Sequence, residues 1–190
     1  MQVGNLSFHN RTKTERGELN FVQAFTESCD TWFYQAGIKM GAEPIIDWAT
    51  KMGFGAKTGI PLRGEVEGRI PTDEYMKKVH GRRLLNGDIA NLSSGQGDCE
   101  VTPLQMAQAM AMVGNGGTFL QTRLVQQVQT LDNEIVTAYQ VREKRSLNAS
   151  PRPIAQVQEA MADGEKSPAG KAKQAGLEEH NLEGKEEAAR

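Results

Sequence analysis

The sequence predicts an α/β protein that is mainly helical and carries one short β-hairpin. Apolar residues recur at helical spacing in several segments, and a clear capping signal at Thr102 precedes the most regular one. Residues 122–131 and 134–141 are rich in Thr, Val and Gln and flank the turn Asp132–Asn133, a pattern typical of two paired strands. The 190 residues suffice for one domain with a hydrophobic core.

Three helices are expected in the first third of the chain. The first carries regularly spaced apolar residues and extends to about Thr26. Asp30 is a plausible N-cap for the second, which Gly41 closes. The third has Pro44 in its first turn and ends at Gly53. Together these segments predict a helical first third.

The strongest helix signal follows residue 101. Thr102 is the predicted N-cap, Pro103 is the first helical residue, and Gln105 completes a capping box. Glycines from Gly114 onward end this helix, and another helix is expected to start at Pro153. The apolar spacing of the first of these helices predicts a buried face made of Leu104, Ala107, Met110 and Ala111.

Two further segments lack this periodicity. Residues 53–100 are rich in glycine and charged residues. Apolar residues that could pack against the core recur in them, so they are expected to form a long, ordered segment with turns and not a linker. From Asp163 onward the chain has few sizeable apolar residues and is expected to be loose, because it buries too little apolar area to order itself. We therefore expect a partial domain over residues 1–162 and a loose or altered tail over 163–190.

Composition excludes several classes of function. A net charge of −2 is too small to indicate nucleic acid or an anionic membrane surface as a partner. The sequence has no apolar run long enough to span a membrane and no signal-peptide core at its start. The two cysteines and three histidines match no metal-ligand spacing, so neither a metal nor another cofactor is expected.

Two groups of motifs carry chemistry. One is the segment 27–35, which reads Glu-Ser-Cys-Asp-Thr-Trp-Phe-Tyr-Gln and contains an S-x-D pattern at Ser28 and Asp30. The other joins residues 91–97, Asn-Leu-Ser-Ser-Gly-Gln-Gly, to the Val-Thr-Pro-Leu-Gln-Met-Ala start of the later helix and to Asn-Gly-Gly. Shorter pieces lie between them: Gly53-Phe54-Gly55, Thr58-Gly59-Ile60 and Leu62-Arg63-Gly64-Glu65.

In this order, over about residues 8–162, these motifs resemble the transpeptidase domain of class B penicillin-binding proteins. The S-x-D form is most similar to the elongation-type, rod-shape enzymes. The resemblance implies the helical part of an α/β, β-lactamase-like domain whose central antiparallel sheet is largely missing here. It also implies a D,D-transpeptidase parent that cross-links peptidoglycan stem peptides through a serine acyl-enzyme and binds penicillin.

That family combines an S-x-x-K nucleophile motif, an S-x-N or S-x-D motif and a K-T-G strand. The resemblance implies that Ser28 is a proton-relay hydroxyl and that Asp30 orients the lysine or the substrate. The alternative is structural, because Ser and Asp are preferred helix caps and both residues precede a helix. Cys29 fills the variable middle position and is expected to be a packed side chain.

The other two family motifs are incomplete in this sequence. No serine is followed by lysine three positions later, so the nucleophile is expected before Met1 and the chain alone is expected to be inactive. Lys57-Thr58-Gly59 spells the third motif but lies where the family has a structural loop. Lys185 is only a weak remnant of that motif, because Glu186 and Glu187 replace its small residues.

The resemblance also implies partners and a location for the parent enzyme. Stem peptides and β-lactams are its expected ligands, and the cell-elongation machinery is its expected partner. The parent is expected at the bacterial cytoplasmic membrane, facing the periplasm or the cell exterior. Two other functions stay open, a non-catalytic remnant with a scaffold role and a β-lactam-sensing or -hydrolysing relative. For residues 94–97, a tight turn is favoured over an anion-binding nest.

Overall fold

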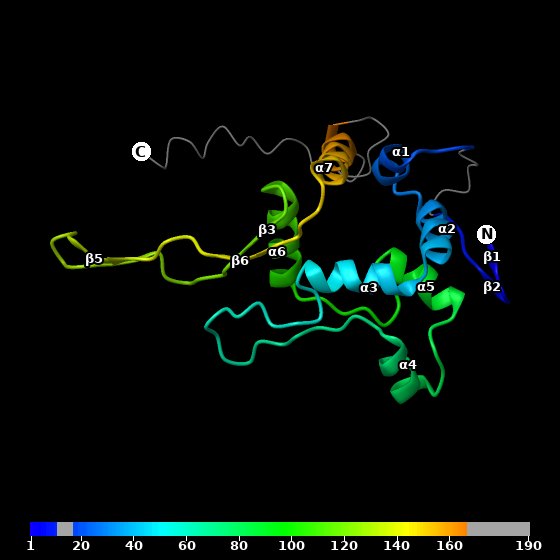
Figure 1. The fold of residues 1–190 in the computed structure, drawn as a ribbon, viewed down its shortest axis with the longest axis horizontal. Coiled ribbons are helices and arrows are strands. Elements are labelled where there is room, and N and C mark those ends of the chain that lie inside the picture. The colour runs from blue at the N-terminus through cyan, green and yellow to red at the C-terminus, as the bar shows by residue number, and fades with distance from the viewer. Residues whose placement is uncertain (11–16, 167–190) are drawn as a thin grey trace.

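A computed structural model of the chain describes residues 1–10 and 17–166. Figure 1 shows a cluster of helices from which a long pair of strands extends. The helices are α1 (Phe21–Thr26), α2 (Asp30–Met40), α3 (Ala42–Lys51), α4 (Asp73–His80), α5 (Asn86–Ser93), α6 (Pro103–Gly114) and α7 (Pro151–Lys166). The strands are β1 (Gln2–Val3), β2 (Leu6–Ser7), β3 (Thr118–Leu120), β4 (Gln127–Gln129), β5 (Ile135–Ala138) and β6 (Glu143–Ser146).

The helices pack on one another and bury a small set of side chains. Helix α2 packs on α5 and α3, while α1 lies beside α7, and α7 also contacts α6. The Thr26 hydroxyl donates to the Ala160 carbonyl at 3.5 Å, which joins α1 to α7 across most of the chain. The buried apolar residues are small or flexible for the most part: Ala24, Cys29, Tyr34, Met76, Ala90, Leu92, Ala109, Met112, Phe119 and Ala160.

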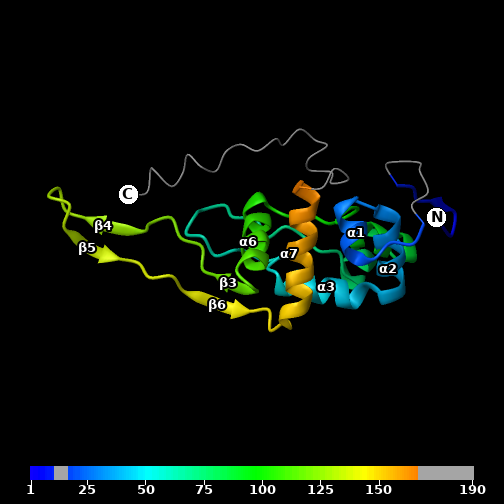
Figure 2. The same ribbon diagram turned by 90° about the horizontal axis from the view of Figure 1, so that it is seen from above.

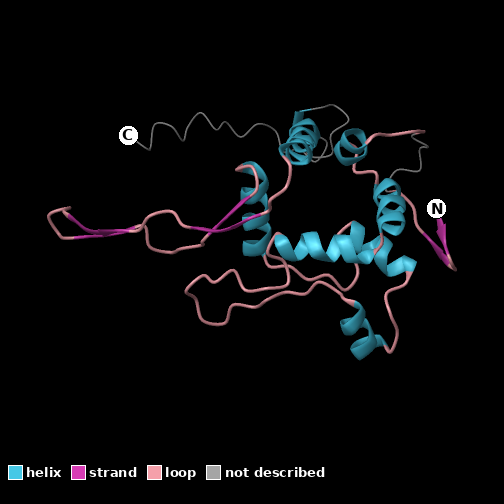
Figure 3. Ribbon diagram, in the orientation of Figure 1, coloured by secondary structure: helices cyan, strands magenta, loops and turns pink. Residues whose placement is uncertain are grey.

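Strands pair only two by two in the part of the chain that the structure describes (Figure 3). Strand β3 pairs with β6, and β4 pairs with β5 around the predicted turn, where Asn133 has a positive φ of 63°. The β4–β5 hairpin projects away from the helices (Figure 2), and every residue from 123 to 146 is exposed. The hairpin prediction is confirmed, and the helices dominate as expected for a domain part without its central sheet.

The start of α6 is as predicted, but its buried face is not. Thr102 Oγ1 accepts a hydrogen bond from the Gln105 amide at 3.1 Å, and Gln105 Oε1 accepts one from the Thr102 amide at 2.8 Å. The buried residues are Gln105, Ala109 and Met112, whereas the predicted Ala107, Met110 and Ala111 are exposed and Leu104 is half-buried.

A polar side chain explains this rotation of the helix. Gln105 Nε2 donates to the carbonyls of Ala56 and Glu67, both at 2.7 Å, and so holds the 53–70 loop against this side of α6. A buried amide that satisfies two loop carbonyls decides which face of the helix is covered. Apolar periodicity alone pointed to the wrong face because it gives glutamine no weight.

Other boundaries also differ from the predictions. Helix α1 begins at Phe21, capped by Asn20, and α7 begins at Pro151, two residues before Pro153. Asp30 is the first residue of α2 and not its N-cap, which is Cys29. The segment at 53–100 contains two helices, α4 and α5, that the sequence did not predict. Helix α7 continues to residue 166, and residues 167–190 lie outside the described part, so the boundary at 162 stays a prediction.

Candidate active site

Ser28 and Asp30 lie at the junction between α1 and α2. Helix α1 ends in a Schellman turn: the Ser28 amide donates to the Phe25 carbonyl at 3.0 Å, and the Cys29 amide donates to the Ala24 carbonyl at 2.8 Å. Ser28 occupies the left-handed position of this turn, with a φ of 52°. Glycine is the usual residue there, because a Cβ is disfavoured in this conformation.

Neither Ser28 nor Asp30 caps α2 with its side chain. The N-cap residue is Cys29, which makes no side-chain capping hydrogen bond. The Thr31 amide donates instead to Oδ1 of Asn10, at 2.9 Å. Ser28 is exposed, and its hydroxyl has no hydrogen-bond partner among residues 1–10 and 17–166. The structural alternative, in which the side chains of both residues cap the helix that follows them, is therefore wrong.

Asp30 lies next to a buried tyrosine one helical turn away. Partial burial raises the pKa of the Asp30 carboxyl. Burial also raises the pKa of the Tyr34 hydroxyl, the negative charge of Asp30 raises it further, and a hydrogen bond with the Ser94 side chain lowers it. Groups from the S-x-D turn and from the glycine-containing turn after α5 thus both act on the pKa of Tyr34.

Close packing of α2 on α5 holds these two turns together. Gly37 on α2 faces Ser93 on α5, and a Cβ added to Gly37 would lie 2.5 Å from the Ser93 Cβ. The position therefore needs glycine because the two helix backbones approach closely. The sequence did not reveal this close contact, because a single glycine inside a helix can be present for several reasons.

The turn at 94–97 is closed on its own helix. The amides of Ser94 and Gln96 donate to the Asn91 carbonyl at 3.1 and 2.8 Å, and the Gly95 amide donates to the Leu92 carbonyl at 3.0 Å. Gly95 and Gly97 both have positive φ. These amides satisfy the last carbonyls of α5 and do not point together at a free anion, so the structure fits the tight turn and not the anion nest.

Lys57-Thr58-Gly59 forms a closed loop. The Glu65 carboxylate accepts hydrogen bonds from the Thr58 amide at 2.7 Å, the Gly59 amide at 3.2 Å and the Thr58 hydroxyl. These hydrogen bonds, that of the hydroxyl first, lower the pKa of Glu65. Thr58 is buried, and Lys144 Nζ donates to its carbonyl at 2.6 Å. This threonine is held in the loop and does not line a cleft. Lys185, the weak remnant of the K-T-G motif, lies outside the described residues.

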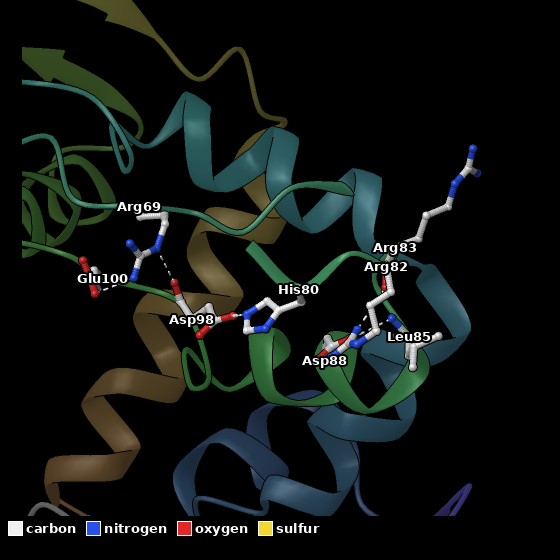
Figure 4. Close-up of polar contacts among 8 residues, drawn as sticks. All are labelled: Arg69, His80, Arg82, Arg83, Leu85, Asp88, Asp98 and Glu100. Atoms are coloured by element: carbon white, nitrogen blue, oxygen red, sulfur yellow. Dashed lines mark hydrogen bonds and ion pairs between the residues drawn. The ribbon is translucent and has the colours of Figure 1, made fainter. Parts of the chain in front are cut away.

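A second polar cluster, which the sequence did not predict, joins α4 and α5 to the loop 94–100 (Figure 4). His80 Nε2 lies 2.7 Å from Asp98 Oδ2, and Arg69 Nε donates to the Asp98 carbonyl at 3.1 Å. Arg82 forms a two-point ion pair with Asp88, at 2.5 and 3.0 Å. A cavity of about 190 Å³ lies among these side chains.

The charges in this cluster are satisfied within it. The hydrogen bond from Arg82 is the main reason that the pKa of Asp88 is lowered, against the effect of partial burial. The Leu85 amide also donates to Asp88, at 2.8 Å. Since these groups already pair with one another, the cluster has a structural role. Its contacts join residues 6, 18 and 29 positions apart, which no local pattern predicts.

Two other kinds of site are absent from residues 1–10 and 17–166. No three or more His, Cys, Asp or Glu side chains gather there as possible ligands of a metal ion. None of the helices described there combines the length and the apolar composition that crossing a membrane requires. Ser28, Asp30 and their neighbours therefore form the principal candidate for chemistry in the described chain.

Comparison with known proteins agrees with the motif order. A family model described as "Penicillin binding protein transpeptidase domain" matches residues 2–185. The chain is 35% identical over 122 residues to Peptidoglycan D,D-transpeptidase MrdA of Haemophilus influenzae, covering 64% of this chain and 19% of that protein. The corresponding protein of Acinetobacter baumannii is 37% identical over 111 residues, which are 58% of this chain and 16% of that protein.

Solved structures share the fold. PBP2 from Helicobacter pylori matches 90% of this chain and 30% of its own, with a TM-score of 0.77 and 24% identity. Pseudomonas aeruginosa PBP2 matches 93% of this chain and 40% of its own, with a TM-score of 0.74 and 24% identity. The chain spans less than a fifth of the curated relatives named above. By the extent of the family match, this chain belongs to the penicillin-binding protein transpeptidase domain family.

Proposed function

We propose that this chain is part of a D,D-transpeptidase that cross-links peptidoglycan stem peptides through a serine acyl-enzyme. In this proposal Ser28 relays a proton toward the leaving amine, and Asp30 orients the lysine of the nucleophile motif or the substrate. The observation that carries it is Ser28 itself. A serine whose side chain caps no helix stands, exposed, in a backbone conformation that favours glycine, which is the kind of local strain that functional sites retain.

Acyl transfer by a serine nucleophile explains why a second hydroxyl, that of Ser28, would be needed. A serine nucleophile near pH 7 needs a base to take its proton, and the departing amine needs a proton in return. The given sequence has no S-x-x-K, so the nucleophile and its lysine would come from outside it, and the chain alone would not react with penicillin. β-Lactams would acylate that same external serine.

A chimera tests this proposal. Residues 8–162 replace the matching segment of the Haemophilus influenzae relative, which keeps its own sequence on both sides, and a fluorescent penicillin reports acylation. We expect the chimera to be labelled and the isolated chain to stay unlabelled. Ser28→Ala in the chimera should slow labelling by about 10²- to 10⁴-fold, the usual contribution of a positioned proton-transfer group.

The controls separate loss of chemistry from loss of folding. The Ser28→Ala chimera should unfold at the temperature of its parent. A folded but unlabelled chimera would contradict the proposal and favour a scaffold role, and rapid release of hydrolysed penicillin would favour a β-lactam-hydrolysing relative. A labelled serine in the isolated chain would also contradict it.

Partners and location follow from the same relationship and belong to the same proposal. Helicobacter pylori PBP2 has been solved as a complex with MreC. This chain shares the fold of that structure, with 23% sequence identity and a TM-score of 0.75. We propose that the parent works with the cell-elongation machinery, at the cytoplasmic membrane, on the outer side. Co-purification of the tagged full-length protein with an MreC-type partner would support this, and its absence from membrane fractions would oppose it.

A further inference from the structure

We propose that Asn10 is a positioning residue, which caps α2 from a distance and thereby holds the S-x-D turn in shape. That this turn matters for catalysis rests on the proposed function, but the capping itself does not. Asn10 Oδ1 accepts a hydrogen bond from the Thr31 amide at 2.9 Å. Asn10 Nδ2 lies 3.5 Å from Cys29 Sγ. One side chain, about 20 residues away in the sequence, thus contacts the residues on both sides of Asp30.

The start of α2 needs such an external partner. The first amides of a helix have no partner within the helix, and an N-cap side chain normally accepts from the second or third of them. Thr31 is the second residue of α2, and the N-cap residue Cys29 makes no side-chain capping bond. The side chains of Ser28 and Asp30 do not accept from this amide either. Asn10 accepts from it, so the Ser28 and Asp30 side chains stay available for the proposed chemistry.

Packing holds Asn10 in place. Strands β1 and β2 form a small hairpin, and the Phe8 amide donates to the Met1 carbonyl at 2.8 Å. The Phe8 ring meets the Tyr34 ring edge to face, with centroids 5.0 Å apart. The Leu6 side chain lies 3.1 Å from the place where a Cβ of Gly87, on α5, would be. The segment that carries Asn10 is therefore packed against both α2 and α5.

The capping bond has a consequence for Ser28. The Asp30 amide donates to the Ser28 carbonyl at 3.1 Å, so the first turn of α2 and the left-handed Ser28 form one hydrogen-bonded unit. Ser28 has no glycine-like freedom and would relax toward negative φ if the start of α2 frayed. By fixing the Thr31 amide, Asn10 keeps Ser28 in the conformation from which its hydroxyl would act.

Three variants of the chain test the capping role. Asn10→Asp keeps the acceptor oxygen, Asn10→Leu keeps a side chain over Cys29 but removes the acceptor, and Asn10→Ala removes both. Two local readouts apply: amide hydrogen exchange at Thr31, and the alkylation rate of Cys29 with Cys99 as an internal reference. Both cysteines are free thiols, and Cys29 is the buried one.

The expected pattern depends on the acceptor. Exchange at Thr31 should speed up about 2- to 30-fold in Asn10→Leu and Asn10→Ala, the range that loss of an N-cap produces, and Asn10→Asp should stay within about threefold of the parent. Cys29 alkylation should rise in the same two variants while the Cys99 rate stays constant. A purely global loss of stability would raise the Cys29 and Cys99 rates together.

Several outcomes would overturn the inference. These are unchanged exchange at Thr31 in Asn10→Leu, parallel changes at the two cysteines, or failure of Asn10→Asp to restore protection. The test needs no enzymatic activity. If the chimera is not labelled by penicillin, the proposed function is refuted but the capping role is not. If the Asn10 variants fail their test while the chimera is labelled, the capping role is refuted but the proposed function is not.

Discussion

Replacing Ser28 by glycine should make this protein more stable, which is unusual for a substitution at a candidate active site. Ser28 has a φ of 52° in the Schellman turn after α1. A residue with a Cβ costs roughly 1–2 kcal/mol in this left-handed conformation, and glycine costs almost nothing there. The variant should gain that strain energy.

One opposing contribution reduces the gain. Glycine increases the conformational entropy of the unfolded chain, which costs about 0.4–1 kcal/mol. No hydrogen bond of the serine hydroxyl is lost, because the hydroxyl has no partner within the described residues, and the side chain is exposed. The net stabilisation expected for Ser28→Gly is about 0.5–1 kcal/mol, or a rise in Tm of about 1–4 °C for a chain of this size.

Urea unfolding of three proteins checks this: the parent, Ser28→Gly and Ser28→Ala. Alanine keeps the Cβ and therefore the strain, but lacks the hydroxyl, so its free energy of unfolding should stay within about 0.5 kcal/mol of the parent. If glycine is no more stable than alanine, the strain argument is wrong. If both variants are destabilised by about 1 kcal/mol or more, the serine hydroxyl stabilises the fold and the structural interpretation of this residue returns.

Further predictions concern elements around the site. Thr102→Ala removes the cap of α6 and should lower the free energy of unfolding by about 0.5–2 kcal/mol, and an unchanged urea midpoint would refute the cap. Gly37→Ala would normally favour a helix, but the contact with Ser93 should make it destabilising by about 1–3 kcal/mol; a rise in Tm would contradict the close approach. Because Thr58 lowers the pKa of Glu65, the stabilisation by that carboxylate is complete near neutral pH and is lost as the pH falls through the lowered value. The difference in urea midpoint between the parent and Glu65→Gln should therefore shrink as the pH falls below the ordinary pKa of glutamate, about 4.3, and a constant difference would argue against the loop contacts.

Local patterns predicted those elements whose ends are determined by neighbouring residues. The capping box at Thr102 and Gln105, the glycine at the end of α2 and the turn at Asp132–Asn133 all depend on groups within a few positions of each other. Helices α4 and α5 were missed because each has only 8 residues, so an apolar pattern repeats over only about two turns. Thr72 before α4 was a usable capping signal, since its side chain accepts from the Tyr75 amide.

In the candidate site, too, local features were visible in the sequence and features that depend on distant residues were not. The S-x-D pattern is local and was visible in the sequence, as was the place of Ser28 and Asp30 beside a helix start. The interpretation of Asp30 as a cap failed because Asn10, distant in sequence, takes that role. The buried face of α6 was wrong for a related reason, since Gln105 bonds to carbonyls 38 and 49 residues away.

The sequence by itself determined the family, the order of its motifs, the absence of S-x-x-K and most helix and turn positions, because these depend on residue identity and short-range hydrogen bonding. Only the tertiary structure decided which side chains cap α2 and which face of α6 is covered. It also decided that Ser28 has a left-handed backbone conformation and that its hydroxyl makes no hydrogen bond within residues 1–10 and 17–166. These features arise from contacts between segments far apart in the chain, where a few buried hydrogen bonds and close helix contacts outweigh the local preferences of each residue.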